Sequence, residues 1–226
     1  MAARAEARRG RGLAAILVLP LAVFLIAMAS LQLSALSGAY RPGDVFLTHS
    51  PRSLQAWLAE LAAEAAGPGA DRISLARRIA DRLVLMPLPD RRKAIVAMTH
   101  PEFWNAIVPK GSTPRAIKEI VLAGTLLALA GSPAAGDLYF AAAWLETALD
   151  GYAQRPRRML EASHVFSPRE IEIVIERERF APLIWTFAGD GERQRLTADF
   201  HLVREAFPRE ADQIAVELAR HGVVIE

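Results

Sequence analysis

The chain has 226 residues, 52% of them hydrophobic, and a formal net charge of +2. One domain typically takes about 100–200 residues, so the length suits a single domain plus a terminal segment. The apolar content excludes a chain that is disordered throughout. The absence of cysteine excludes disulfides, thiolate metal sites and a cysteine nucleophile.

The basic charge is confined to the N-terminus. Residues 1–12 have a net charge of +3, so residues 13–226 sum to −1. Nucleic-acid binding needs a basic face that neutralises phosphates. This distribution gives no indication of such a face, and we expect no nucleic-acid partner.

Residues 13–36 form an uncharged apolar stretch directly after these arginines. At 1.5 Å per residue, a helix of this length covers a hydrocarbon core of about 30 Å. We predict a basic cytoplasmic N-terminus over 1–12, a transmembrane helix or signal segment over 13–36, and a linker over 37–50. The positive-inside rule then places residues 40–226 outside the cytoplasm.

The sequence is compatible with both a retained and a cleaved N-terminal segment. Ala27-Met28-Ala29 is a small-x-small cleavage pattern, and a second candidate site follows Ala39. A retained segment gives a single-pass protein of the bacterial inner membrane with a periplasmic domain. A cleaved segment gives a protein secreted to the periplasm. A buried core helix is a third alternative, although long uncharged stretches behind arginines are rare in soluble folds.

A Ser-Pro or Thr-Pro pair precedes four apolar-periodic runs, at residues 50–51, 113–114, 132–133 and 167–168. Ser and Thr cap free helix N–H groups, and proline fits the first helical position. Glu170 completes a capping box with Ser167. The helices that we expect are 51–66, 73–85, 90–98, 101–108, 114–130, 133–150, 156–163, 168–187, 191–206 and 208–221, with Gly222 as the last C-cap.

Three segments leave alternatives. Residues 171–180 alternate partly like a strand, but the capping box favours a helix. Residues 121–130 are apolar on all sides, which predicts a central buried helix, with Gly124 at a close helix–helix contact. Residues 223–225 are expected to add a short strand or to fray.

Consecutive helices joined by short loops, without βαβ alternation, predict an all-α domain over 51–226. Its architecture is expected to be a helical bundle or a short α-solenoid of stacked helical hairpins. The segment 137–168 is the best match to one tetratricopeptide-like unit.

No catalytic, cofactor-binding or metal site is expected from the motifs. The histidines at 49, 100, 164, 201 and 221 have no i, i+3 or i, i+4 spacing. The chain lacks a G-x-S-x-G elbow. Residues 109–113 lack the glycine and lysine order of a phosphate loop, and 189–191 lack further calcium-ligand spacing.

Charged clusters are interpreted as structural. Glu170, Glu172, Glu176 and Glu178 are interleaved with arginines, which predicts a solvated, salt-bridged face; paired carboxylates for glycan cleavage are the alternative. Asp137 and Glu146, within an apolar helix, are expected to mark an interface or a helix start. The basic residues of 155–158 are expected to be a solvated loop, with anionic headgroups or an acidic partner as the alternative.

A resemblance covers residues 131–187. The segments concerned are Ser132–Tyr139, Ala142–Leu145 and Phe166–Ile171, with Arg177 and Trp185. This part of the chain resembles a group of poorly characterised bacterial envelope proteins that have an N-terminal anchor and a helical, tetratricopeptide-like domain. The resemblance implies a link with envelope or exported-polysaccharide systems and carries over no catalytic residue.

Together these features predict a non-enzymatic, membrane-anchored interaction or scaffold module of the bacterial envelope. The resemblance implies that this module is an accessory protein of polysaccharide synthesis or export. Its expected partners are the lipid bilayer, through residues 13–36, and an envelope protein. A periplasmic enzyme that acts on envelope glycan through a carboxylate pair is the alternative. A structural subunit of a larger membrane complex is a third hypothesis. Partner identity and oligomeric state stay open.

Overall fold

The computed structural model describes residues 51–67, 69–109, 113–223 and 225. The predicted N-terminal segments 1–12, 13–36 and 37–50 lie outside the described residues. The described residues form helices and contain no strand, which confirms the all-α class for this part of the chain. The helices are α3 (Pro51–Ala65), α4 (Arg72–Leu85), α5 (Leu88–Thr99), α6 (Pro101–Ile107), α7 (Pro114–Gly131), α8 (Gly136–Asp150), α9 (Gln154–Phe166), α10 (Ile171–Ile184), α11 (Asp190–Ala206) and α12 (Pro208–Arg220).

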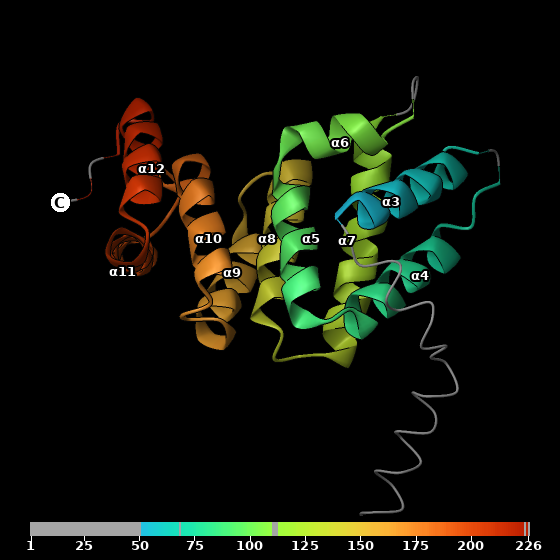
Figure 1. Cartoon of the computed structure of the whole chain (residues 1–226), viewed down its shortest axis with the longest axis horizontal. Helices are drawn as coiled ribbons and strands as arrows, with labels where there is room; N and C mark the ends of the chain where they lie inside the picture. Colours follow the sequence, from blue (N-terminus) through green and yellow to red (C-terminus); the bar gives the residue numbers. More distant parts are fainter. Residues whose placement is uncertain (1–50, 68, 110–112, 224, 226) are drawn as a thin grey trace, which may run out of the picture. The chain divides into compact units, whose positions relative to one another are not determined.

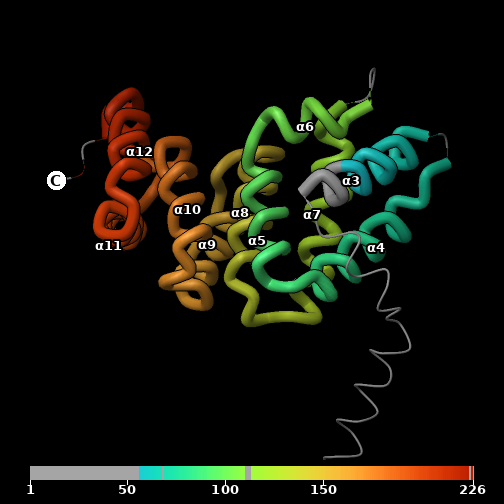
Figure 2. Tube along the Cα trace, viewed as in Figure 1, coloured from blue at the N-terminus to red at the C-terminus, as the bar shows by residue number. Residues whose placement is uncertain are grey.

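These helices belong to one compact unit, Ser50–Glu226, and share one apolar core. The helix α4 packs on α7, and the pairs α7–α8, α8–α9, α10–α11 and α11–α12 pack as neighbours along the chain (Figures 1 and 2). The helix α5 packs against both α8 and α10 and so connects the α8–α9 pair with the α10–α11 pair. None of the described helices meets the length and hydropathy requirements of a membrane-spanning segment.

The Ser-Pro and Thr-Pro pairs begin helices in two ways. The helices α3 and α7 start at the proline itself, as predicted. The helices α8 and α10 start three residues later, at Gly136 and Ile171, after a turn that contains the proline. The predicted starts at 133 and 168 are therefore wrong. The predicted capping box is wrong too: the Ser167 hydroxyl donates to the Glu170 side chain at 2.7 Å, and α10 has no side-chain cap.

These two turns are packed closely against each other. A Cβ added at Gly136 would lie 2.6 Å from Cβ and 2.7 Å from the backbone nitrogen of Ser167. The start of α8 and the start of the second turn therefore touch, and only glycine fits at this contact. The helix starts at Gly136 and Ile171 are 35 residues apart, close to the repeat of about 34 residues in tetratricopeptide proteins.

Other boundaries differ only in detail. The predicted helix 156–163 extends over Gln154–Phe166, and the ambiguous segment 171–180 is helical. Pro182 lies inside α10 near its end, and the helix stops at Ile184 rather than at residue 187. Gly222 has a φ of +73°, the left-handed conformation of a helix C-terminus, as expected.

Gly124 of α7 makes the predicted close helix contact. A Cβ at this position would lie 2.6 Å from Cβ of Ile79 and 2.8 Å from the carbonyl oxygen of Ala76, both in α4. The absence of a side chain lets the two helix backbones approach each other. The prediction that α7 is buried on all sides is wrong, because Ala123, Leu127 and Ala130 face outward.

Replacing Gly124 by alanine tests this contact. Alanine normally stabilises a helix interior relative to glycine, but here its methyl group overlaps α4, so we expect Gly124→Ala to lower the free energy of unfolding by about 1–3 kcal/mol. Gly131→Ala is the matched control, because a Cβ there would meet only Cγ2 of Val84 at 3.9 Å. Urea unfolding followed by circular dichroism measures both variants. A stabilised Gly124→Ala protein would contradict the contact.

Candidate functional site

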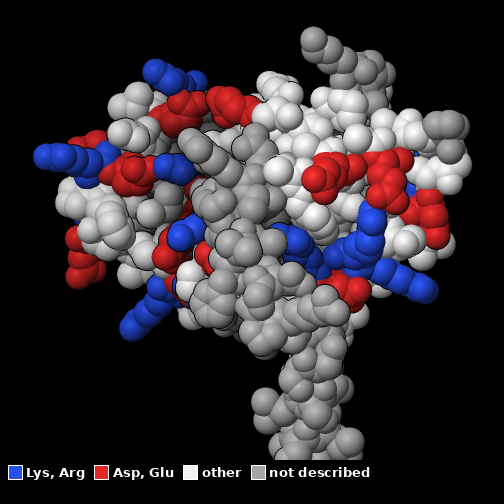
Figure 3. Space-filling view, turned by 45° about the vertical axis from the view of Figure 1, so that its right-hand side comes forward, with Lys and Arg blue, Asp and Glu red and all other residues white. Residues whose placement is uncertain are grey.

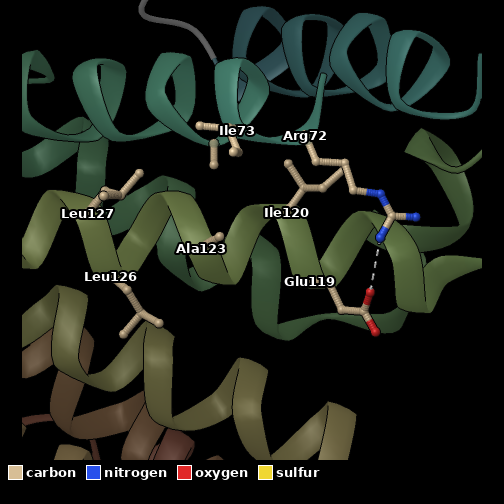
Figure 4. Close-up of a pocket in the computed structure, with 8 residues that line it drawn as sticks. Arg72, Ile73, Glu119, Ile120, Ala123, Leu126 and Leu127 are labelled. Atoms are coloured by element: carbon tan, nitrogen blue, oxygen red, sulfur yellow. Dashed lines mark ion pairs between the residues drawn. The ribbon is translucent and has the colours of Figure 1, made fainter. Parts of the chain in front are cut away.

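An apolar groove runs along the surface between α4 and α7. Its volume is about 480 Å³, and Figure 4 shows Ile73 of α4 pointing toward α7 with an ion pair at one end. The residues that line it are Arg72, Ile73, Ala76, Glu119, Ile120, Ala123, Leu126 and Leu127. Most of these side chains are aliphatic, so the groove offers a surface for an apolar ligand.

The two helices that form the groove run parallel and in register. Arg72 pairs with Glu119 at 3.7 Å, and twelve residues further along each helix Val84 lies next to Gly131. The close approach at Gly124 and Ala76 lies between these points. The shared register keeps the outward-facing side chains of both helices in one straight strip.

Large aliphatic side chains in this strip are open to solvent. Ile73 is 66% exposed, Leu127 46% and Val84 39%. Single exposed apolar residues need no explanation, but neighbouring ones around a groove are typical of an interaction surface. The Arg72–Glu119 pair adds little energy, because both side chains are exposed and surface ion pairs contribute about 0–1 kcal/mol.

The histidines do not come together. His49 lies outside the described residues, and His100, His201 and His221 are exposed on three different helices or helix ends. His164 of α9 is mostly buried, and its Nε2 lies 3.2 Å from Oδ2 of Asp199. Among the described residues no group of three or more potential metal ligands is found.

The loops at 109–113 and 189–191, which lack complete binding motifs, each lead into a helix. Residues 110–112, between α6 and α7, lie outside the described residues. In the other loop, Gly189 is the N-cap of α11, and Asp190 and Gly191 already lie in the first turn of that helix.

The carboxylates of α10 are dispersed over different partners. Glu170, just before α10, and Glu172 pair with Arg92 of α5 at 2.9 and 3.6 Å. Glu176 accepts hydrogen bonds from Thr99 of α5 at 2.7 Å and from Arg179 at 2.6 Å. Glu178 is fully buried and neither of its carboxyl oxygens has a hydrogen-bond partner. Glu176 and Glu178 therefore point away from the solvated face that the sequence predicted.

Arg177 is the largest of the fully buried side chains. Its guanidinium donates to both carboxylate oxygens of Asp199 in α11, at 2.6 and 3.3 Å. It also donates to the carbonyl oxygens of Ser163 and Ser167, at 3.4 and 3.1 Å. The predicted solvated position of Arg177 is wrong, and this side chain instead joins α9, α10 and α11.

Asp137 and Glu146 mark helix interfaces, one of the two expected alternatives. Asp137 is buried at the start of α8 and accepts two hydrogen bonds from Arg91 of α5, at 2.6 and 3.1 Å. Glu146 pairs with Arg155 at 2.9 Å. Burial raises the pKa of Glu146, and the charge of Arg155 opposes this shift.

The basic cluster of residues 155–158 is largely engaged by the protein. Arg155 binds Glu146, and Arg157 pairs with the buried Glu192 at 3.4 Å and donates to the carbonyl oxygen of Phe187. The predicted loop is wrong, because residues 155–158 lie in the first turns of α9. On the face shown in Figure 3, basic and acidic residues alternate over the surface.

Lys118 of α7 lies against two tryptophans. Its Nζ is 5.2 Å from the ring centroids of both Trp104 and Trp144, whose planes are nearly parallel, at 7°. Burial lowers the pKa of Lys118. Such cation–π contacts hold α6, α7 and α8 together.

Of these features, only the α4–α7 groove combines a defined volume with solvent-exposed lining side chains. The sequence analysis did not predict this groove. It interpreted the apolar residues of 121–130 as a buried core helix, whereas part of their surface lines the groove. Comparison with protein-family models, with curated proteins and with solved structures finds no match to this chain.

Asp199→Ala tests the energetic role of the buried ion pair. Removing this carboxylate leaves the charge of Arg177 buried without its partner, so we expect the free energy of unfolding to fall by about 3–5 kcal/mol. Glu217→Ala, which removes an exposed partner of Arg220, is the control and should cost about 1 kcal/mol or less. Denaturant titration measures both. Equal effects of the two substitutions would show that Arg177 does not depend on Asp199.

Proposed function

We propose that the chain is a membrane-anchored interaction module of the bacterial envelope, and that the α4–α7 groove is its docking surface. The observation that carries this proposal is the exposed aliphatic strip around a groove of about 480 Å³. An N-terminal segment of 24 uncharged residues behind a basic cluster supports the membrane anchor. In this arrangement the helical domain faces the periplasm.

The proposed occupant is an amphipathic helix of a partner protein. Two parallel helices with a straight groove between them offer the surface on which a third helix packs by its apolar face. From Ile73 to Val84 the strip covers about 16 Å at 1.5 Å per residue, enough for three turns of a docked helix. The partner helix would present apolar residues at i, i+3, i+4 and i+7.

The stacking of helical hairpins supports a scaffold role. The pairs α8–α9 and α10–α11 follow each other with an offset of 35 residues. Proteins built from such stacked hairpins commonly bind segments of partner proteins along their surface. We therefore place this module among accessory proteins of envelope assembly, and the resemblance of residues 131–187 favours polysaccharide synthesis or export.

The proposed glycan-cleaving enzyme would need two carboxylates that face one substrate. Glycosidase carboxylates are about 5–10 Å apart on the two sides of the scissile bond. In the described residues, Glu170 and Glu172 pair with Arg92, Glu176 is buried against α5, and Glu178 is buried. None of these residues lines the α4–α7 groove, so no observation favours this alternative over the interaction module.

A photo-crosslinking amino acid at position 127 tests the docking surface in intact cells. We expect an adduct with a segment of an envelope protein that has the predicted helical pattern of apolar residues, because this position lines the groove. Ile73→Glu, at the opposite wall, should abolish the adduct, because it places a charge where the partner helix packs. Mass spectrometry of the adduct identifies the segment.

The control places the same crosslinker at position 183. Leu183 of α10 is 57% exposed but does not line the groove. Adducts of equal yield and identity at both positions would contradict a specific docking surface. So would an adduct at position 127 that survives Ile73→Glu unchanged.

Membrane retention tests the anchor separately. We expect the full-length chain to stay in the membrane fraction after an alkaline carbonate wash and to keep residues 1–12, because residues 13–36 prefer lipid to water. A variant that lacks 13–36 should leave this fraction. N-terminal sequencing of the mature protein identifies its first residue. A start at Ser30 or Tyr40 would show that the segment is cleaved and that the predicted anchor is wrong.

A further inference from the structure

A carboxyl group without a hydrogen-bond partner lies in α10, next to the junction that Arg177 forms between α9, α10 and α11. Glu178 of α10 has no exposed surface, and neither of its carboxyl oxygens has a hydrogen-bond partner. Burial strongly disfavours the charged form of a carboxyl group when nothing compensates for the lost water. The buried position of Glu178 therefore favours the protonated, neutral form of its carboxyl group.

The charges around Glu178 lead to the same conclusion. Its neighbour Arg177 is the nearby cation, and the guanidinium is already bound to both oxygens of Asp199. His164 of α9 also faces Asp199, with Nε2 at 3.2 Å, and its Nδ1 donates to the carbonyl oxygen of Leu160 at 2.8 Å. Burial raises the pKa of Glu178 well above its usual range, the charge of Asp199 adds to the shift, and that of Arg177 opposes it.

The arginines of α5 and Arg179 of α10 are bound to other carboxylates. In α5, Arg92 pairs with Glu170 and Glu172, and Arg91 pairs with Asp137 of α8. Toward α12, Arg179 of α10 itself binds Glu176 and Glu210. An ionised Glu178 would thus add a second buried carboxylate near Asp199, which already pairs with Arg177.

We propose that this junction is a proton-dependent latch: a neutral Glu178 lets α10 and α11 pack together, and loss of its proton loosens the α10–α11 hairpin. The proton leaves the carboxyl oxygen to water, and no other bond changes. The buried position of Glu178 and the pairing of Arg177 with Asp199 carry the proposal.

The sign of the pH dependence follows from proton binding. Below the ordinary pKa of glutamate, about 4.3, the carboxyl group is neutral in both the folded and the unfolded chain. As pH rises above this value, the unfolded chain loses the proton while the folded chain keeps it. The ratio of folded to unfolded protein then falls about tenfold per pH unit, until the pH passes the raised pKa of the folded state.

Glu178→Gln tests the latch in the full-length chain, purified in detergent. We measure the unfolding equilibrium in urea from pH 5 to pH 9 and express the wild type relative to the variant, which cancels the contribution of other groups. We expect this ratio of unfolding constants to rise by up to tenfold per pH unit above pH 5. Glu205→Gln, at an exposed position of α11, is the control and should follow the wild type.

Amide hydrogen exchange then locates the change. At pH 8 we expect residues 171–206 to exchange faster in the wild type than in Glu178→Gln, by a larger factor than residues 114–131, and at pH 5 we expect no difference. Should the glutamine variant fail to fold, Glu178→Leu replaces it, because leucine is neutral and needs no hydrogen-bond partner. A variant with the pH dependence of the wild type, or exchange that changes equally in 114–131, would overturn the latch.

Discussion

Arg177 has no exposed surface, so its charge has to be matched inside the protein, and much of the C-terminal half is arranged around that need. Asp199 of α11 supplies the matching carboxylate, and α9 and the turn after it supply two carbonyl oxygens. A buried ion pair contributes little net stability compared with apolar residues of the same shape, but breaking it is costly. The contacts of Arg177 therefore join residues of three helices, and removal of Asp199 would leave a buried charge unmatched.

Ion pairs of α5 connect further helices in the same way. Its apolar side chains Ala94, Ile95 and Met98 enter the core, while Arg91 binds the buried Asp137 and Arg92 binds the carboxylates at the start of α10. Helices α8 and α10 come from consecutive hairpins, and α5 lies across both. The orientation of these hairpins is thus set by directional ion pairs as well as by apolar packing.

The sequence was accurate where local chemistry decides the outcome. The helices α3, α6 and α7 begin at proline, and Gly124 lies at a close helix contact, because both features depend on a residue's own geometry. The starts of α8 and α10 were misplaced, because a Ser-Pro turn followed by a helix has the same local signal as a capped helix. The groove was missed, since an apolar helix surface has the same composition whether a neighbour covers it or not.

The all-α class and the order of the helices in the described part of 51–226 were determined by the sequence alone, because periodicity and capping act within one or two turns. Only the tertiary structure decided which charged residues are buried. Glu176, Arg177 and Glu178 are consecutive, so no helical periodicity could place all three inside. Their burial requires α5, α9 and α11 to surround α10 on several sides, and that depends on contacts between residues far apart in the chain.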